Sequence, residues 1–279
     1  DRSPSRGLGD VYKRQDIDGI VTERTKAAGG IIIGKTNACH SGHKDMCDNL
    51  IGPPCRNPWK LDRTSGGSSG GAGAAVAAGL GQLAQGSDGA GSIRIPAALC
   101  GTCGLKPSFG RIPHWPNKTS WRAIAHDGPM TRTVADAALY LQALAGPDPR
   151  DPVSIDSSPD DYVAAVAQPV EAMKGLRVAW SEDLGYAADD PEVRELTRRA
   201  AERFSDLGCL QINFIGQSFC AIILLRNGIS IKGIGFHNVR SSVEISFMDL
   251  PNYIRTGKAC LLYTSDAADD TPCVDLGGR

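Results

Sequence analysis

The chain from Ser65 to Gly81 reads SGGSSGGAGAAVAAGLG, and it joins two patterns that usually belong to different structures. Its first half is a glycine–serine run, which in isolation is typical of a flexible linker. Its second half opens a run of mainly small residues, from Ala72 to Leu83, that predicts a helix packed closely against other backbone. Four glycines flank Ser68 and Ser69, and glycine allows unusual dihedral angles and close approach of other segments. The stretch therefore predicts a folded turn around two hydroxyl groups and not a tether.

A second turn of small residues follows in the stretch GSDGAGSIRIPAALCGTCGLKPSFGRIP, residues 86–113. Its first part, from Ser87 to Ser92, presents successive backbone N–H groups. Such a turn is a candidate oxyanion hole around a nucleophilic serine. Ser68 and Ser92 are 24 positions apart, so the predicted helix carries the chain from one serine turn to the other.

Helical patterns and short apolar runs alternate around these turns. Residues 19–30 have helical spacing and stop at a glycine pair, and Thr133 is a candidate N-cap for a helix that ends on Gly146. A further helix with one apolar face ends at Gly208, and residues 36–64 have the composition of a loop. The runs IIIG, residues 31–34, and GLRVAW, residues 175–180, predict strands, the first of them fully buried. This alternation predicts an α/β domain.

Composition excludes several functional classes. The chain has 279 residues, 41% of them hydrophobic, so it can bury a core, and its net charge of −1 gives no electrostatic case for binding nucleic acid or an anionic membrane. No apolar run approaches the roughly 20 residues of a membrane span. The opening residues DRSPSRGLGD contain no apolar segment of a signal peptide. Nine cysteines without framework spacing indicate reduced thiols and a cytoplasmic location.

Both ends of the chain are predicted to be translated adapter DNA. The letters DVYKRQ, residues 10–15, can be encoded by GAT GTG TAT AAG AGA CAG, and the reverse complement of that DNA, read from its second base, encodes CLLYT, residues 260–264. Residues 1–15 and 260–279 are therefore set apart from the fold. Residues 208–259 are a doubtful segment, because alanine falls from 28 in the 192 residues of 16–207 to 2 in these 52. Such a shift can mark a domain boundary, but a frameshift, an unspliced segment or a chimeric join is the favoured interpretation.

The ordered motifs of residues 16–207 resemble the amidase signature family. They are RNPW, GGSSGG, GSDGAGSIRIPAALCG, GLKPSFGR and GPMTRTVADAA. The resemblance implies an α/β fold with a mixed β-sheet covered by helices on both faces, of which this chain contains an incomplete part. It implies hydrolysis of a carboxamide to a carboxylate and ammonia or an amine, without a metal or organic cofactor. A small-molecule amide is the implied substrate, with no nucleic acid or membrane as partner, and a homodimer is compatible with it.

The resemblance also implies roles for single residues. Ser92 resembles the nucleophile that becomes acylated, and Ser68 resembles the bridging serine, whose preceding peptide bond is cis in the family. The backbone N–H groups expected to stabilise the oxyanion belong to Gly89, Ala90, Gly91 and Ser92. The supporting hydroxyls are those of Ser87 and Ser69, and the residues that brace the loop are Asp88 and Arg94.

One part of the family's serine–serine–lysine arrangement has no counterpart. The catalytic lysine of the family precedes the GGSSGG motif by so much that it would lie before residue 1. Lys35 matches a different, downstream lysine of the family and receives no catalytic role, and Lys106 is expected to brace structure. Without a base a serine is a weak nucleophile, so the chain as given is expected to be inactive. One component of a tRNA-dependent amidotransferase and a non-catalytic remnant are the alternatives.

Other interpretations of single motifs compete with this one. Residues 66–70 also fit the G-x-S-x-G nucleophile elbow, but that motif needs a preceding strand, and RNPWKLDRT is a poor one. Cys100 and Cys103 have the CxxC spacing of a redox dithiol, although two buried small residues are expected. A metal site is the less favoured interpretation of Cys39, His40, His43, Cys47 and Cys55, whose spacing matches no zinc pattern. Trp115 and Trp121 either line a substrate channel or cover the core.

Overall fold

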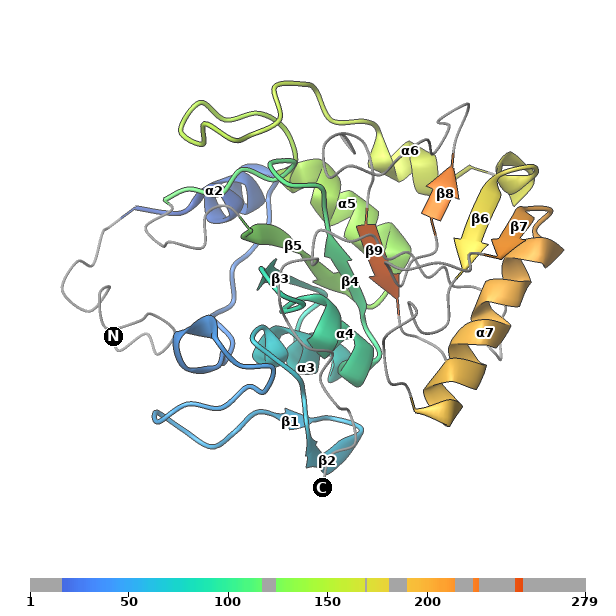
Figure 1. The fold of residues 1–279 in the computed structure, drawn as a ribbon. Coiled ribbons are helices and arrows are strands. Elements are labelled where there is room, and N and C mark those ends of the chain that lie inside the picture. Colours follow the sequence, from blue (N-terminus) through green and yellow to red (C-terminus); the bar gives the residue numbers. More distant parts are fainter. Residues whose placement is uncertain are drawn as a thin grey trace. The chain divides into compact units, whose positions relative to one another are not determined.

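The computed structural model describes residues 17–116, 124–168, 170–180, 190–213, 223–225 and 244–247. The chain divides into two compact units, Asp1–Val166 with Ser246–Asp249 and Ala167–Ile245 with Leu250–Arg279 (Figure 1). The predicted adapter segments, residues 1–15 and 260–279, and Trp121 lie outside the described residues. Of the doubtful segment 208–259, residues 208–213, 223–225 and 244–247 are described, and they contribute short strands.

A four-stranded sheet has the strand order β3-β5-β4-β9, of which β3, β5, β4 and the second half of β9 belong to the first unit. The strands are β3 (Leu83–Asp88), β5 (His126–Thr131), β4 (Cys103–Lys106) and β9 (Glu244–Phe247). β5 runs antiparallel to both β3 and β4. All six residues of β5 are buried, so other elements cover both of its faces. Met130 on β5 packs against Ala72, Ile93 and Ala97, which places α3 and α4 over one face. The observed α/β architecture confirms the predicted fold class.

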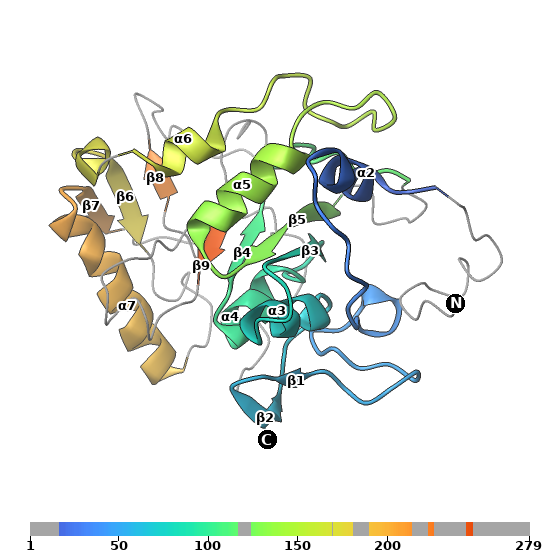
Figure 2. The same ribbon diagram turned by 180° about the vertical axis from the view of Figure 1, so that it is seen from behind.

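Three helices pack around this sheet in Figures 1 and 2. They are α3 (Gly70–Ala77), α4 (Arg94–Cys100) and α5 (Val134–Leu144). The predicted cap of α5 is confirmed, because Thr133 Oγ1 accepts a hydrogen bond from Asp136 N at 3.1 Å and Gly146 follows with φ +115°. α3 is shorter than the predicted 72–83 helix. It gives way to a turn in which Gly79 has φ +74°, and β3 already begins at Leu83.

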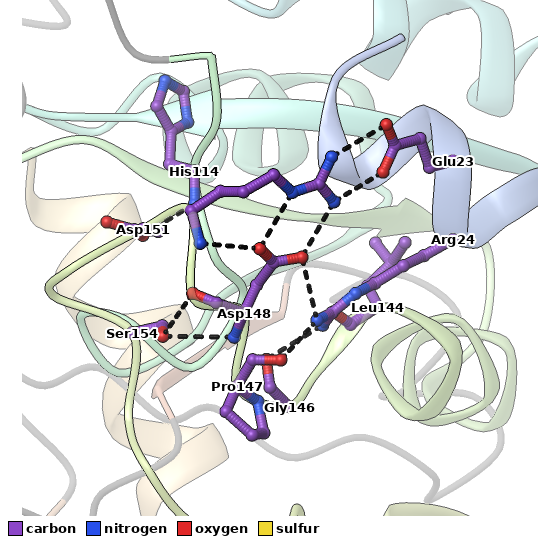
Figure 3. Close-up of polar contacts among 10 residues, drawn as sticks. Glu23, Arg24, His114, Leu144, Gly146, Pro147, Asp148, Asp151 and Ser154 are labelled. Atoms are coloured by element: carbon purple, nitrogen blue, oxygen red, sulfur yellow. Dashed lines mark hydrogen bonds and ion pairs between the residues drawn. The ribbon is translucent and has the colours of Figure 1, made fainter.

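Helix α2 (Ile20–Ala27) confirms the predicted first helix and is tied to the loop after α5, as Figure 3 shows. Arg24 Nη1 donates to the carbonyls of Leu144 and Gly146, and Arg24 Nη2 donates to Pro147 O at 2.9 Å. Arg150 forms hydrogen bonds with both Glu23 and Asp148 in the same network. The Arg24 hydrogen bonds satisfy the carbonyl of Leu144, the last residue of α5, and two carbonyls just beyond the helix.

The predicted strand at residues 31–34 is wrong. Ile31 and Ile33 are 88% and 78% exposed, and the segment has no regular structure. A strand forms only where a neighbouring strand supplies hydrogen-bond partners. Among the described strands, β3 is an edge strand of the sheet and pairs with β5 alone, so residues 31–34 do not pair with its free edge. The predicted loop of residues 36–64 is confirmed in part, because it also contains a short 3₁₀ turn, η1 (His40–Gly42), and a hairpin of β1 (Arg56–Asn57) and β2 (Lys60–Thr64).

Among the described residues, the first unit also contains α6 (Tyr162–Val166), which contacts α5. The second unit contains η3 (Val170–Met173), β6 (Arg177–Trp180), α7 (Pro191–Asp206), β7 (Leu210–Asn213) and β8 (Ile223–Leu225). Its β6 pairs parallel with β7 and antiparallel with β8, around a core of Val178, Phe204 and Cys209. The predicted strand at 175–180 and the helix that ends before Gly208 are confirmed. Within the described ranges, none of the helices combines the length and the apolar character that a membrane span requires.

Candidate active site

The four glycines around Ser68 and Ser69 allow other backbone to approach closely, as their pattern predicted. A Cβ on Gly66 would lie 2.9 Å from Pro96 Cα, and one on Gly67 would lie 2.6 Å from Lys44 O. On Gly70 it would lie 2.5 Å from Cys47 Cβ, and on Gly71 it would overlap the backbone of Asn37. Segments before and after the turn therefore occupy the space that side chains would need. The linker interpretation is excluded, because the turn is held on several sides.

Ser68 is buried in this turn, and the peptide bond between Gly67 and Ser68 is cis, as the resemblance implied. The neighbouring Ser69 connects the turn to β3 and to the loop after it. Ser69 Oγ donates to Ser87 O at 3.3 Å and accepts from Ser87 N at 3.2 Å. Ser69 N donates to Ser92 O at 3.2 Å. The two serine turns, 24 residues apart, are therefore joined through their backbones.

Asp88 at the end of β3 organises the loop that carries Ser92. Its Oδ1 accepts from Gly91 N at 2.7 Å and from Arg94 Nη2 at 2.9 Å. Its Oδ2 accepts from Ile93 N at 3.2 Å and from Arg94 Nε at 2.9 Å. Gly91, with φ +104°, supplies the left-handed backbone that brings the loop back toward the carboxylate. Half-buried Ser92 lies between these donors in the sequence, two residues before the first residue of α4.

The electrostatics of Asp88 suit a permanent negative charge. Burial alone would raise the pKa of its carboxyl group, but the hydrogen bonds and positive charge of Arg94, together with Gly91 N–H, lower that pKa to about 2. Both Asp88 and Arg94 are almost fully buried. Such an ion pair holds a loop in place and exchanges no proton near neutral pH.

The N–H groups of the loop are not all available for an oxyanion. The expectation for Gly91 differs from the structure, because its N–H donates to Asp88. Ser87 N–H is likewise used, by the Ser69 hydroxyl. For the N–H groups of Gly89, Ala90 and Ser92 no acceptor occurs among the described residues. Gly89 and Ala90 are exposed, so a substrate oxygen can approach them from solvent.

The elements of a serine–histidine elbow are not brought together. A strand does precede Gly66, contrary to expectation, but β2 belongs to an exposed two-stranded hairpin and not to the main sheet. His126 Nδ1 is within hydrogen-bond distance of Asp88 O and Ile124 O, and burial lowers its pKa, so the ring is neutral and donates there. His114 forms a hydrogen bond with Asp127, which raises the pKa of the histidine.

The structure supports neither a metal site nor a CxxC redox dithiol at the cysteines with suggestive spacing. Within the part of the chain that the structure describes, no group of three or more histidine, cysteine or acidic residues could hold a metal ion. Burial raises the pKa values of Cys100 and Cys103 to about 12, which matches the expected buried small residues and not a reactive dithiol.

Trp115 lies under the guanidinium group of Arg150. The distance from the Arg150 Cζ atom to the centre of the Trp115 ring is 4.6 Å.

Sequence reasoning missed the loop that covers the serine turn. Gly71 N donates to Asn37 O at 3.1 Å, and Asn49 Nδ2 donates to the Asn37 side chain. The GKTN segment thus packs on the start of α3. The close glycine spacing at 66–71 predicted that some backbone approaches, but nothing in the pattern identified which segment does so.

A sequence model of the amidase family matches residues 8–216. An acylamidase from Rhodococcus erythropolis is 52% identical over 189 residues, which are 68% of this chain and 39% of that protein. One component of the glutamyl-tRNA(Gln) amidotransferase from Synechococcus sp. (strain RCC307) is 41% identical over 192 residues, 69% of this chain and 39% of that protein. This chain thus spans about two fifths of the length of these relatives.

Solved structures agree with the sequence matches. A bacterial aryl acylamidase of the amidase signature family superposes with a TM-score of 0.67 and 36% identity, over 76% of this chain and 43% of that one. A 6-aminohexanoate cyclic dimer hydrolase, solved with its substrate, gives a TM-score of 0.68 and 35% identity, over 75% and 44% of the two chains. The chain therefore belongs to the amidase family.

Proposed function

We propose that the protein containing this chain is an amidase that hydrolyses a carboxamide through an acyl-enzyme on Ser92. The observation that carries the proposal is the hydrogen bond from Ser69 N to Ser92 O, 3.2 Å long, which joins the GGSSGG turn to the nucleophile loop. Membership of the amidase family and the acylamidase relative support the same chemistry.

In the proposed reaction Ser92 Oγ attacks the amide carbonyl carbon and its proton passes to Ser68. The carbonyl oxygen becomes an oxyanion, which the N–H groups of Gly89, Ala90 and Ser92 stabilise, while Gly91 N–H remains on Asp88. Ser68 then delivers a proton to the leaving nitrogen, the C–N bond breaks and an ester on Ser92 remains. Water hydrolyses this ester by the reverse proton route. We assign no lysine of this chain to the base that exchanges protons with Ser68.

Ser69, Ser87 and the Asp88–Arg94 pair are positioning residues in this scheme. The Ser69 hydroxyl bonds the N–H and the carbonyl of Ser87, which fixes the end of β3 relative to the serine turn. The ion pair fixes the loop between β3 and α4. Neither interaction needs to change during the reaction.

The test uses a hybrid enzyme, because the chain spans 39% of the Rhodococcus erythropolis acylamidase. In the hybrid, residues 17–213 replace the segment of that acylamidase to which they align. Ser92→Ala is expected to lower kcat for an N-acetyl aryl amide by at least about a thousandfold, because the covalent route is lost. Ser157→Ala, at an exposed serine, is the matched control and keeps full turnover. Turnover by the Ser92→Ala hybrid at the parent rate contradicts the proposal.

The amidotransferase relatives suggest a second function, that of a component that passes ammonia to a partner protein. The identity of 52% to the acylamidase, against 41% over a similar length, favours the hydrolase. A hydrolase acts alone, whereas an amidotransferase component needs its partner proteins. Turnover of the aryl amide by the hybrid alone supports the hydrolase. Ammonia release from glutamine that depends on added amidotransferase components supports the alternative.

We further propose a small-molecule amide as substrate, a cytoplasmic location and a homodimer as the assembly. These follow from the near-neutral charge, from the unpatterned cysteines and from the resemblance to the amidase signature family. Sedimentation of the hybrid tests the assembly, and a monomer would overturn that part of the proposal.

A further inference from the structure

Cys47 and Cys55 meet beneath the serine turn. Cys55 N donates a hydrogen bond to Cys47 O at 2.8 Å, which pairs the two backbones. Cys47 Sγ lies 3.4 Å from the position of a Cβ on Gly70, and the Cys55 thiol donates a hydrogen bond to Gly70 O at 3.8 Å. Both sulfur atoms therefore lie against the first residue of α3. The fold of the loop brings the two cysteines together although they are eight positions apart in the sequence.

The two thiols have different environments. A hydrogen bond from the Cys47 thiol is the main influence that lowers the pKa of Cys55, and Ser65 adds to it against the opposing effect of burial. The same contact, with burial, raises the pKa of Cys47. Cys47 is 1% exposed, whereas Cys55 is half-buried. Cys55 is thus the more exposed and the more acidic of the two thiols, and Cys47 is its buried, less acidic neighbour.

We propose that Cys47 and Cys55 form a redox-active dithiol, a site of reversible oxidation by hydroperoxides. The Cys55 thiolate attacks the O–O bond of the peroxide and becomes a sulfenic acid, and water or an alcohol leaves after protonation. Cys47 sulfur then attacks the Cys55 sulfur, the S–O bond breaks, and a second water leaves with the Cys47 proton. The two sulfurs lose two electrons in total and the peroxide oxygens gain them. A dithiol reductant returns both thiols.

The first step also activates the second thiol. The hydrogen bond to Cys55 is the largest influence that raises the pKa of Cys47, and the Cys55 charge adds to it. Oxidation of Cys55 to a neutral sulfenic acid removes that charge. The Cys47 thiol then loses its proton more readily at the moment when it must act as the nucleophile.

The other described cysteines near this site are poorer candidates. Burial raises the pKa of Cys100, and its thiol donates to Ser65 O at 3.4 Å. Cys39 Sγ accepts a hydrogen bond from Lys44 N at 3.2 Å. Neither has the thiol contact that Cys47 and Cys55 share.

Oxidation of this pair is expected to reach the serine turn, a consequence that rests on the proposed function. The backbone of Lys44, Asp45 and Met46, directly before Cys47, lies against Gly67. Gly67 in turn precedes the bridging residue, Ser68. A disulfide that moves Cys47 therefore moves the support of Ser68, and we expect peroxide to lower amide turnover of the hybrid until a dithiol is added.

The test of the thiol site uses the 279-residue chain and does not depend on turnover. Trypsin releases residues 45–56 as one peptide that contains Cys47 and Cys55 and no other cysteine. The reduced chain is treated with one equivalent of hydrogen peroxide, alkylated with iodoacetamide under denaturing conditions and digested. The expected peptide carries no alkyl group and is two hydrogen masses lighter than the reduced form. After dithiothreitol it carries two alkyl groups.

The peptide that contains Cys100 and Cys103 is the internal control and is expected to be alkylated twice before and after peroxide. In Cys47→Ser, dimedone is expected to trap a sulfenic acid on Cys55, whereas Cys55→Ser leaves Cys47 unoxidised. Two alkyl groups on the 45–56 peptide after peroxide, or a disulfide that joins Cys55 to Cys100, would overturn the proposal. An intact disulfide with unchanged hybrid turnover would overturn only the link to Ser68.

Discussion

Asp88→Asn is the substitution that tests the loop geometry most severely. The carboxylate of Asp88 accepts hydrogen bonds on both oxygens, so either orientation of an asparagine amide turns its NH₂ group toward N–H donors. Arg94, whose side chain is 6% exposed, loses its counter-charge at the same time. Removing one partner of a buried ion pair costs about 3–5 kcal/mol of the free energy of unfolding.

The pKa of Asp88 gives a second estimate of its contribution to the free energy of unfolding. The pKa of Asp88 falls from an ordinary value of 3.8 to about 2 in the folded protein. A shift of almost two pKa units corresponds to about 2.5 kcal/mol. Because the folded pKa is the lower one, this stabilisation is present above pH 4 and is lost as the pH falls through the folded pKa. It falls to about half its neutral value near pH 3.

The assay is urea denaturation of the hybrid followed by circular dichroism at pH 7 and at pH 3. We expect Asp88→Asn to lower the free energy of unfolding by about 3–5 kcal/mol at pH 7 and by clearly less at pH 3. Asp156→Asn, at an exposed aspartate, is the control. A loss below about 0.5 kcal/mol at pH 7, or an equal loss at both pH values, refutes the reasoning, since surface substitutions have effects of that size.

Three further predictions concern the same unit. Ser68→Ala in the hybrid is expected to lower kcat by about 10²–10⁴-fold with little change in KM, because a proton relay is lost, and an unchanged kcat would exclude that role. Gly67→Ala places a Cβ 2.6 Å from a carbonyl oxygen of the neighbouring loop, so thermal denaturation should show a loss of about 1–3 kcal/mol. Gly34→Ala is the control, because its Cβ meets no atom within 4 Å, and it should leave the stability nearly unchanged. Equal losses of stability in the two variants would contradict the close approach of backbone to Gly67. Asp127→Asn is expected to lower the raised pKa of His114, measured by NMR titration, and an unmoved pKa would refute the pairing. The stabilisation by protonated His114 is present below about pH 6.5 and disappears as pH rises through its folded pKa.

Several features of the fold could be predicted because they depend on local chemistry. Thr133 caps α5 and Gly146 follows its end, since a side-chain oxygen and a residue with positive φ are local requirements. The glycines around Ser68 predicted a close approach for the same reason. The strand at 31–34 could not be judged in this way, because pairing depends on a partner strand elsewhere in the chain.

The candidate site shows the same division. The sequence motifs predicted that Asp88 braces the loop that carries Ser92, and in the structure Asp88 ends β3 and accepts a hydrogen bond from Gly91 N of that loop. The use of Gly91 N–H by Asp88 depends on how the loop folds back on the carboxylate, which no spacing encodes. The contact between Cys47 and Cys55 depends on the course of an irregular loop, which their spacing does not encode. The CxxC pattern instead indicated Cys100 and Cys103.

The central claim, that Ser92 carries the acyl group, is tested most directly by mass spectrometry of the hybrid during turnover. The hybrid is quenched in acid while it hydrolyses a slow N-acyl aryl amide, and the tryptic peptide of residues 64–94 is sequenced by fragmentation. The account predicts one acyl group on Ser92 and none in the Ser92→Ala hybrid. An acyl group on Ser68 or on another serine of that peptide would contradict it.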